Sequence, residues 1–567
     1  MRRLAALVPG LLAVLAEPAP GGEPAGGPPR HKAWKLVFRD EFSGPKLDES
    51  KWTRSRSISP AFVWNRSKGR LCQDHADVDG QGHFVVKVTR DADGTYRYHP
   101  GIHTKGKFHR TYGYFEARAR FTRQPGWWGA FWLYGVEVGP NPFVMGQEID
   151  VFEDFVKPKK KLDFRHNVHF DSQLARAAGD QGRLGKLEGN VLYRVSRGTS
   201  VLVNDWDAFH VVGVEWTPLE YVFYCDGRET FRLDYRQVPV TTQPMHVLIS
   251  GCFRKPRKGS FLGDYADANW PDQLTVDYVR VYEEDPGTRQ RPKVSLRMSK
   301  PARVVPTGQS VAFEVSANKV GGSIKRVLLF DNGRIRAEKE SASATFTVPA
   351  SQLYTGNNIL IAMARGSDGL IGMSEPLDLL VRKHSDRPGR PYGGRPQAIP
   401  GRLVAGHYDE GGQGTAYGSY LRDNVFGRPP WNLKFRPTEG IHSPKASGIS
   451  ASHRGLWVVY TVRVQKTGDY RVTPFIARPD AMRGSSTKRD RIFLTMDDKP
   501  LTDFSFKPKL TTGTQYWDNY RPLPARTVRL TEGTHSLQVR FDATPFNFGG
   551  LEFSPVSRRD KAAASGP

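Results

Sequence analysis

The feature that most constrains the fold is a period of two in hydrophobicity that recurs along most of the chain. Runs such as "HFVVKVTR", "GYFEARARF", "FHVVGVEWT" and "LTVDYVRVY" alternate apolar with polar residues or are continuously apolar, with Gly, Asp and Asn turns between them. This pattern is typical of β-strands, and helical periodicity is scarce. A chain of 567 residues is also too long for one core. The sequence therefore predicts an all-β protein of about three domains.

Composition shifts mark the expected boundaries. Pro/Gly-rich stretches read as linkers, and the strand-rich stretches between them are long enough for β-sandwiches. The expected order is a signal peptide over 1–16, a disordered linker over 17–30, a large β-sandwich over 31–284, an immunoglobulin-like sandwich over 293–383, a basic linker over 384–398, a third β-sandwich over 399–556 and a polar tail over 557–567. The middle sandwich shows no site and is expected to space the other two.

The N-terminus predicts export. "MRRLAALVPGLLAVLA" has two arginines, then an apolar run that is too short to span a bilayer, then small residues. A secretory signal explains these features, and an inert tail is the alternative. No later stretch is apolar for long enough to span a membrane. We therefore expect a secreted or periplasmic protein without a membrane span.

The three cysteines fit no metal motif. Cys225 lies in the strand-like run "YVFYCDG" and is expected to be a small buried residue. A bridge between Cys72 and Cys252 is an open alternative for an exported chain.

The charge balance favours an anionic partner. A formal net charge of +25 and a pI of about 9.9 attract polyanions. Nucleic acid is disfavoured, because the chain has no basic helix or nucleic-acid motif and is expected to be exported. A sulfated or carboxylated polysaccharide remains, with a generic basic surface as the alternative.

The segment "GQEIDVFEDF" carries its acids at uneven spacing. Glu148 and Asp150 are two apart and share one face of a strand, whereas Glu153 would point to the other face. A β-bulge at Val151–Phe152 absorbs one residue and returns Glu153 to the face of Glu148. Asp154 then points away, and we expect no catalytic role for it.

Three carboxylates on one face suit glycosidic bond cleavage. Retention of configuration needs a nucleophile and a proton donor roughly 5 Å apart, with different pKa values. Asp150 would hold one glutamate by a hydrogen bond and keep the two pKa values apart. This chemistry needs no cofactor or metal. A strand face of solvated acids is the alternative.

Upstream, "PGWWGAFWLYG" offers Trp127, Trp128 and Trp132, whose rings provide flat faces for sugars. Core packing is the alternative function for such rings, and we expect it for one of the three.

The segment from Trp34 to Tyr282 resembles glycoside hydrolase family 16. "LVFRDEFSGPKLDESKW", "GIHTKGKF", "YGYFEARARF", "PGWWGAFWLYG", "GQEIDVFE", "FHVVGVEWTPLEYVFYCDG" and "VDYVRVY" occur in that family's order. The resemblance implies a β-jelly roll with an open cleft and retaining endo-cleavage of β-linked polysaccharides. By position it implies a nucleophile at Glu148, an acid/base at Glu153, an assisting carboxylate at Asp150, a cleft-floor ring at Trp132 and a cross-cleft histidine at His169. The bulged E-x-D-x-x-E form resembles the branch of laminarinases, agarases, porphyranases and carrageenases.

Two basic segments suggest the substrate. Residues 54–70, with Trp64 and Arg66, and residues 254–258 would form a cationic rim with an aromatic anchor if both are cleft-edge loops. Arginine forks pair well with sulfate oxygens, so the favoured substrate is a sulfated galactan such as carrageenan or porphyran. Neutral β-1,3-glucan is the alternative. A non-catalytic carbohydrate-recognition protein is the other, disfavoured because both glutamates are retained.

Residues 399–556 resemble carbohydrate-binding module family 6 through "IPGRLVAGHYDEGGQGTAYG", "RPTEGIHS", "GLWVVYTVRVQKTGDYRV", "LTEGTHSLQVRFD" and "FNFGGLEF". The resemblance implies sugar binding by aromatic stacking and an asparagine, for which the candidates are Asn547, Trp517, Tyr417 and Trp457, with core packing as the alternative for Trp457. Two departures weaken it. Val404 to Gly406 replace the acidic residues usually linked to a structural calcium, and Gly549 and Gly550 replace the second asparagine and the tryptophan. A purely structural role is the alternative.

Overall fold

The computed structural model describes residues 13–14, 26–55, 69–135, 147–156, 162–170, 195–242, 244–253, 268–302, 304–331, 333–353, 356–382, 390–412, 415–418, 435–436, 441, 446–452, 456–478, 490–507, 518–543 and 546–556. Trp64, Arg66, Trp517, residues 254–258, the tail and nearly all of the predicted signal peptide lie outside these ranges, so the expectations for them stay predictions. The described ranges contain strands and short 3-10 turns but no α-helix. The predicted all-β class is confirmed.

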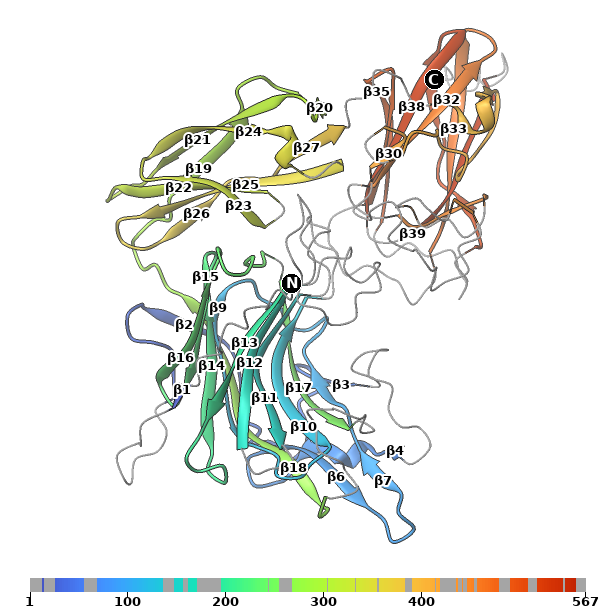
Figure 1. Cartoon of the computed structure of the whole chain (residues 1–567). Helices are drawn as coiled ribbons and strands as arrows, with labels where there is room; N and C mark the ends of the chain where they lie inside the picture. The colour runs from blue at the N-terminus through green and yellow to red at the C-terminus, as the bar shows by residue number, and fades with distance from the viewer. Residues whose placement is uncertain are drawn as a thin grey trace, which may run out of the picture. The chain divides into compact units, whose positions relative to one another are not determined.

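The chain divides into two compact units, which are described separately (Figure 1). The first holds residues 1–136, 146–170 and 195–290, and the second holds residues 137–145, 171–194 and 291–567. The expected division into three β domains stays a prediction.

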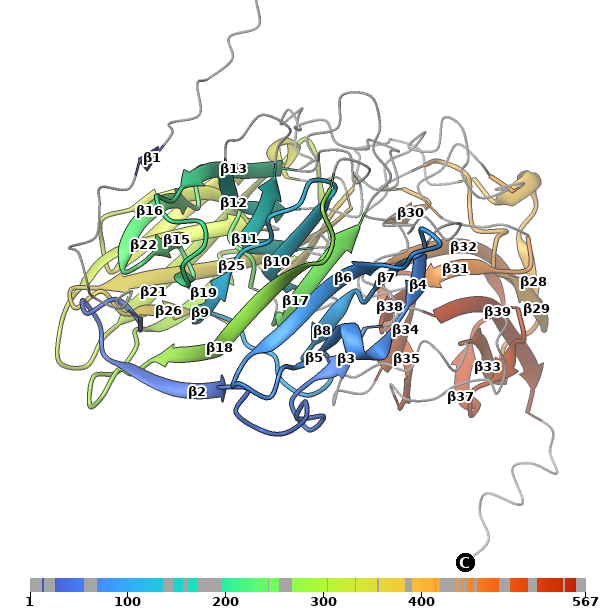
Figure 2. The same ribbon diagram turned by 90° about the horizontal axis from the view of Figure 1, so that it is seen from below.

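The first unit is built from two mainly antiparallel sheets, each with one parallel pair at its edge. The eight-stranded sheet has the order β1 (Ala13–Val14), β13 (Val195–Leu202), β12 (Leu162–Phe170), β11 (Glu148–Val156), β10 (Trp127–Tyr134), β17 (His246–Phe253), β8 (Gly101–His103) and β3 (Thr53–Arg54), with β1 parallel to β13. The ten-stranded sheet comprises β16 (Arg228–Asp234), β15 (Glu220–Cys225), β14 (His210–Trp216), β9 (Gly113–Arg120), β18 (Asp272–Glu284), β6 (Phe84–Arg90), β7 (Tyr96–Tyr98) and β4 (Gly69–Leu71), with β2 (Trp34–Asp40) on β18 and β5 (Ala76–Val78) on β6. A 3-10 turn, η1 (Gln73–His75), precedes β5. Figures 1 and 2 both show β10, β11, β12 and β13 side by side.

Alternation along the central strands explains the core between the sheets. On β10 and β11, Trp127, Phe131, Ile149 and Phe152 are fully buried. The rings of Phe131 and Phe152 lie 6.3 Å apart, and Phe152 also meets Phe121 at 5.1 Å. A glycine is required where Trp127 fills the layer, because a Cβ on Gly251 would lie 2.2 Å from the indole ring. The alternate residues of β10 and β11 therefore lie on the opposite face of the eight-stranded sheet, away from this core.

The segment before β2 differs from the expected linker. The amide of Gly27 donates to Glu116 Oε2 at 2.9 Å, and the indole of Trp34 donates to the Pro29 carbonyl at 2.8 Å. Residues 26–30, predicted to be disordered, therefore lie against the outer face of the ten-stranded sheet. Glu116 is completely buried there, and its unmet need for a donor explains the contact. The linker prediction over 17–30 is wrong for these residues.

The second unit contains two pairs of sheets, each pair around its own apolar core. The first pair comprises a three-stranded sheet of β19 (Lys293–Met298), β21 (Ser310–Asn318) and β24 (Ser343–Pro349), and a six-stranded sheet of β20 (Val304–Pro306), β27 (Leu377–Arg382), β25 (Gly356–Gly366), β22 (Ile324–Asp331), β23 (Arg334–Lys339) and β26 (Ile371–Met373), with η4 (Ala350–Gln352) after β24. Phe313 and Val315 of one sheet pack with Leu329 and Ala362 of the other. These residues form a two-sheet sandwich.

The second pair follows residue 390 after the turn η5 (Tyr392–Gly394). One sheet holds β28 (Gln397–Ile399), β32 (Trp457–Val464), β38 (Gly533–Asp542), β34 (Asp490–Met496), β35 (Lys499–Phe506) and β30 (Tyr417–Gly418); the other holds β29 (Gly401–Val404), β39 (Phe546–Pro555), β33 (Gly468–Ala477), β36 (Arg521–Pro522), β31 (Ile449–Ser452) and β37 (Arg526–Leu530). Residues 397–398 pair with β32, so the predicted linker over 384–398 ends before them.

Cys72 and Cys225 are free thiols, and Cys225 is fully buried as predicted. The bridge between Cys72 and Cys252 is therefore not formed. Within the described part of the chain, no helix has the length and apolar character needed to cross a membrane.

Candidate active site

The bulge predicted from the acid spacing is present on β11. Against β10, Glu153 pairs with Ala130 and Phe152 with Phe131, but Asp150 pairs with Trp132, which leaves Val151 as the extra residue. Against β12, the register also shifts between Asp150 and Glu153. Val151 and Phe152 are both fully buried. The extra residue is therefore absorbed toward the core.

Pairing shows which residues share a face with the acids. Residues directly opposite each other in an antiparallel pair project to the same side. Glu148 lies opposite Tyr134, Asp150 opposite Trp132, and Glu153 opposite Ala130. Because Ala130, Trp132 and Tyr134 alternate with the core residues of β10, all three acids lie on the side away from the core. We call this side, defined by Glu148, Asp150 and Glu153, the acid-bearing face.

The tryptophans of "PGWWGAFWLYG" divide between the two sides of the sheet. Trp127 is fully buried in the core, as expected for one of the three. Trp128 and Trp132, at 5% and 8% exposure, pack with Ala130 and Leu248 on the acid-bearing face. The Trp132 indole donates to Ser250 Oγ at 3.0 Å, which fixes its ring beside Asp150. Trp128 and Trp132 thus lie beside the acids, as expected of sugar-contacting rings.

His169 belongs to the same group of residues. It lies opposite Glu148 on β12, and its Nε2 atom is 3.3 Å from Asp150 Oδ2 and 2.8 Å from Asn167 Nδ2. Its Nδ1 atom is hydrogen bonded to Ser196 Oγ of β13. One polar group each of Glu148, Asp150 and His169 falls within 4.8 Å of the others. The predicted neighbourhood of His169 and the acids is therefore present.

The carboxyl group of Glu153 has a raised pKa. Burial raises its pKa well above the usual carboxyl value, and the negative charges of Asp150 and Glu148 raise it further. His169 and Arg165 act in the opposite direction but more weakly. A carboxyl group that keeps its proton near neutral pH suits a general acid.

Asp154 points into the core, as predicted. It accepts hydrogen bonds from the Thr122 amide at 2.8 Å, the Thr122 hydroxyl at 3.0 Å and the Gly129 amide. It is completely buried, and burial raises its pKa to about 7. Its partners are all structural, so Asp154 joins β11 to the neighbouring segments.

Sequence reasoning missed several residues on the acid-bearing face. Arg165 lies opposite Glu153 and Asn167 opposite Asp150, both on β12. The alternation in "DFRHNVHF" places them on the face of His169 and was the signal available for finding them. Tyr134, next to Glu148, and His246, opposite Tyr134 on β17, complete the row.

The candidate sugar-binding residues of the C-terminal β-sandwich are less favourable. Asn547 lies on β39 with 5% exposure, and Tyr417 and Trp457 are fully buried. A fully buried ring has no face for a sugar, so the stacking prediction is wrong for Tyr417 and Trp457. A packing role for Trp457 is the correct alternative, because its ring is buried with Val459 and packs directly over Gly418, although on the face of β32 opposite the core residues Val458 and Tyr460.

The calcium implied by the module family does not fit the residues present. Val404, Ala405 and Gly406 offer no carboxylate. Instead, the guanidinium of Arg436 donates to the Tyr408 carbonyl and, at 2.8 Å, to the Asp409 carbonyl. The same group lies 3.7 Å from the centre of the Tyr408 ring. The positively charged side chain of Arg436 therefore binds the carbonyl groups at this turn.

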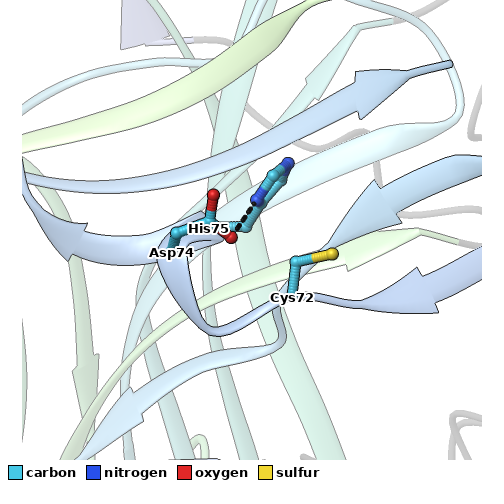
Figure 3. Close-up of side chains that lie close together, drawn as sticks. All are labelled: Cys72, Asp74 and His75. Atoms are coloured by element: carbon cyan, nitrogen blue, oxygen red, sulfur yellow. Dashed lines mark hydrogen bonds and ion pairs between the residues drawn. The ribbon is translucent and has the colours of Figure 1, made fainter.

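One further cluster, Cys72, Asp74 and His75, has the composition of a metal site (Figure 3). His75 Nδ1 is 2.9 Å from Asp74 Oδ1, the pair joined by the dashed line in Figure 3, and His75 Nε2 is 2.9 Å from Thr89 Oγ1. Both ring nitrogens thus have hydrogen-bond partners within the protein, which makes this arrangement a structural one.

Paired carboxylates beside tryptophan rings on one face of a sheet are the arrangement that carboxylate-dependent glycoside hydrolases require. Residues 71–280 match the family model described as glycosyl hydrolases family 16. The chain therefore contains a glycoside hydrolase family 16 domain, as its resemblance to that family predicted.

Similar proteins include several glycoside hydrolases. The beta-glucanase of Rhodothermus marinus is 28% identical over 276 residues, which cover 44% of this chain and 85% of that protein. The glucan endo-1,3-beta-glucosidase A1 of Niallia circulans is 25% identical over 281 residues, 44% of this chain and 38% of that protein. The keratan-sulfate endo-1,4-beta-galactosidase of Sphingobacterium multivorum is 26% identical over 265 residues, 44% of this chain and 55% of that protein. The chain thus spans about half or less of the last two relatives.

Among solved structures, the laminarinase of Rhodothermus marinus is 25% identical and covers 45% of this chain and 100% of its own, with a TM-score of 0.34.

Proposed function

We propose that the domain over 31–284 is a retaining endo-glycoside hydrolase that cleaves a β-linked polysaccharide by double displacement. The observation that carries this proposal is the bulge on β11, which brings Glu148, Asp150 and Glu153 to one face. Glu153, with its raised pKa, is the acid, and Glu148 is the nucleophile. The match to a glycoside hydrolase family supports the same assignment.

The reaction follows from these roles. Glu148 forms a bond to the anomeric carbon while the glycosidic bond breaks and the leaving oxygen takes the proton of Glu153. The deprotonated Glu153 then takes a proton from water, whose oxygen attacks the same carbon and releases Glu148. Asp150, whose Oδ2 atom lies 3.3 Å from His169 Nε2, keeps negative charge beside both glutamates. A sugar hydroxyl could replace the water, so transglycosylation is the related outcome.

The test is release of reducing ends from laminarin, agarose, porphyran and carrageenans. Wild-type protein should cleave at least one, and Glu148→Gln should lower kcat at least about a thousandfold, because it removes the nucleophile. Proton NMR of the first product should show the β-anomer. No release from any polymer, an undiminished Glu148→Gln variant, or an inverted first product would each overturn the proposal.

The favoured substrate is a sulfated galactan, and basic groups on and beside the acid-bearing face support it. Arg165 lies opposite Glu153, and His103 and His246 lie on β8 and β17 with their rings 6.0 Å apart. Burial, then the charges of His103, Lys105 and His109, lower the pKa of His246 to about 3. Burial is the larger cause, and the added effect of His103, Lys105 and His109 shows that basic groups surround His246, where an anionic substituent would find partners.

The position of these groups suits a sugar near the cleaved bond. His246 is two strands from Glu148, with Tyr134 between them, which corresponds to about 10 Å between their backbones. The amide of Lys105 donates to His103 Nδ1 at 3.2 Å, which leaves the proton of a neutral His103 on Nε2, where it can be donated to an oxyanion. The similarity to a keratan-sulfate hydrolase is consistent with a sulfated substrate.

A comparison of a sulfated galactan with its desulfated form tests this preference. The ratio of kcat/KM for the sulfated galactan to kcat/KM for the desulfated form should fall about tenfold in the double variant His103→Gln, Lys105→Met, because charge-assisted contacts are lost. Lys46→Met removes an exposed charge elsewhere and serves as the control. An unchanged ratio in the double variant would reject these residues as the sulfate contacts.

Neutral β-1,3-glucan is the second candidate, favoured by the similarity to the glucanases of Rhodothermus marinus and Niallia circulans. Equal turnover of laminarin with no activity on any anionic galactan would select it. A non-catalytic recognition protein is the third candidate, and polymer binding without any release of reducing ends would select that.

Secretion and sugar binding by the C-terminal β-sandwich are also part of the proposal. The N-terminal pattern of arginines, apolar run and small residues supports export, which N-terminal sequencing of protein from the medium or periplasm would test. Affinity electrophoresis of the C-terminal sandwich within the full chain carrying Glu148→Gln, with and without Trp517→Ala, tests binding through Trp517.

A further inference from the structure

The core side of the bulge carries a histidine that the proposed reaction does not use. His166 is the β12 residue between Arg165, which pairs with Glu153, and Asn167, which pairs with Asp150. It therefore lies across from the extra residue of β11. Its side chain is completely buried on the side opposite the acids.

His166 is hydrogen bonded to the bulge itself. Its Nδ1 atom lies 2.6 Å from the carbonyl oxygen of Val151. An extra residue in one strand disrupts the ladder of backbone hydrogen bonds, so a bulge carbonyl needs a partner from elsewhere. A carbonyl only accepts, so His166 Nδ1 must carry a proton and donate it.

The ring is neutral and its tautomer is fixed. Burial lowers the pKa of His166 to about 3, so the ring holds one proton at any ordinary assay pH. With that proton on Nδ1, Nε2 must accept, and Thr230 Oγ1 lies 2.8 Å from it. The Thr230 hydroxyl also approaches the Phe223 carbonyl, but at 3.2 Å. The shorter contact to Nε2 is the one consistent with the neutral ring.

These contacts connect the two sheets at the bulge. Thr230 belongs to β16 of the ten-stranded sheet, whereas Val151 and His166 belong to the eight-stranded sheet. The ring of His166 is also held 4.6 Å from the ring of Phe223 on β15. Rotation of His166 is therefore restricted on both sides, and the Val151 carbonyl is anchored to a rigid layer.

We propose that His166 is a positioning residue that holds the Val151 bulge from the core side and thereby sets where Glu153 stands relative to Glu148 and Asp150. This inference rests on the proposed function of Glu153 as the acid. His166 touches no substrate, because its side chain lies beneath the sheet. A displacement of about 1 Å between reacting groups costs roughly a hundredfold in rate, so a small relaxation of the bulge matters.

Three variants separate positioning from general stability. His166→Phe fills the space but leaves the Val151 carbonyl without its donor. His166→Gln keeps a donor and an acceptor on one side chain. Thr230→Val is nearly isosteric and removes only the hydroxyl that donates to Nε2 and holds the ring against β16. His99→Phe is the matched control, since His99 is another fully buried histidine of this unit, away from the bulge, with a lowered pKa.

The expected results are specific to kcat. At a temperature well below unfolding, His166→Phe should lower kcat about a hundredfold with KM within twofold, Thr230→Val about tenfold, and His166→Gln less than either. The alkaline limb of the pH profile should move to lower pH in the first two, because Glu153 moves away from its negative neighbours. His99→Phe should lower the melting temperature without changing kcat or the limb.

Two outcomes overturn the inference: kcat and the alkaline limb unchanged in Thr230→Val, or the same loss of kcat in His99→Phe as in His166→Phe. If His166→Phe fails to fold, Thr230→Val decides. Carbon-13 NMR titration of Glu153 reads its pKa without substrate, so a protein with no detectable hydrolysis would defeat the proposed function while this measurement still tests the role of His166.

Discussion

His169 Nε2 on β12 lies 3.3 Å from Asp150 Oδ2 on β11. The two strands pair regularly from Glu148 to Asp150, and their register shifts between Asp150 and Glu153. This contact ties the carboxylate between the two glutamates to β12. Asp150 therefore stays beside Glu153, whose pKa it raises together with burial.

Replacement of Asp150 should change the pH profile as well as the rate. Asp150→Asn removes a negative charge that raises the pKa of Glu153, so Glu153 loses its proton at lower pH. The alkaline limb of kcat/KM should move to lower pH, with kcat reduced about a hundredfold or more. The profile of Asp93→Asn, at an exposed site, should overlay that of wild type. An unmoved limb in Asp150→Asn would contradict the coupling.

The adjacent tryptophans should respond in opposite ways. Trp127→Ala leaves a cavity in the core and should lower the free energy of unfolding by about 3–5 kcal/mol. Trp128→Ala removes a ring on the acid-bearing face and should raise KM severalfold, with a smaller loss of stability. Urea denaturation and Michaelis–Menten kinetics on the cleaved polymer measure the two effects. Equal destabilisation without a change in KM would contradict the division of faces.

The catalytic domain should lose stability as pH rises from about 4 to 7. Burial raises the pKa of Glu116 to about 7 in the folded protein, and an unfolded carboxyl titrates near pH 4. The folded state thus binds more protons in this window, and unfolding becomes easier as pH rises. Glu116→Gln keeps an acceptor for the Gly27 amide and should flatten the dependence. The measurement is the denaturant midpoint of wild type and of Glu116→Gln at several pH values. If the two midpoints change in parallel with pH, the prediction for Glu116 is wrong.

The C-terminal sandwich should be indifferent to calcium and sensitive to Arg436. Chelation should not change its melting temperature, because Arg436 already binds the carbonyls at the turn. Arg436→Met removes the guanidinium donor from those carbonyls and should cost about 2–3 kcal/mol. Arg395→Met, at an exposed site, is the control. A rise in melting temperature on adding calcium would show that the turn does bind the metal.

The sequence was sufficient where a simple geometric rule applied. The period of two, broken once between Asp150 and Glu153, predicted both the bulge and the shared face, because a strand has only two sides. It could not decide between Trp127 and Trp128, since adjacent identical rings give no sign of which one faces the core.

The residues that sequence reasoning missed depend on pairing. Arg165 and Asn167 come beside the acids only through the register between β11 and β12, which is set by the whole sheet. Tyr417 and Trp457 were candidates for sugar stacking, but large rings gain most from burial, and both are fully buried. The absence of acidic residues at Val404 to Gly406 was visible in the sequence, whereas the contact of the distant Arg436 with the carbonyls of Tyr408 and Asp409 was not.

The bulge also determines how the site would respond to the deletion of one residue from β11. Loss of the codon for Val151 would remove the residue that β11 carries in excess and convert E-x-D-x-x-E into a regularly alternating E-x-D-x-E. All three carboxylates would remain on one face, with Glu153 one step closer to Asp150. A single in-frame deletion could therefore pass through a protein that still aligns its acids, which gives a lineage of such enzymes a short evolutionary route between the two spacings.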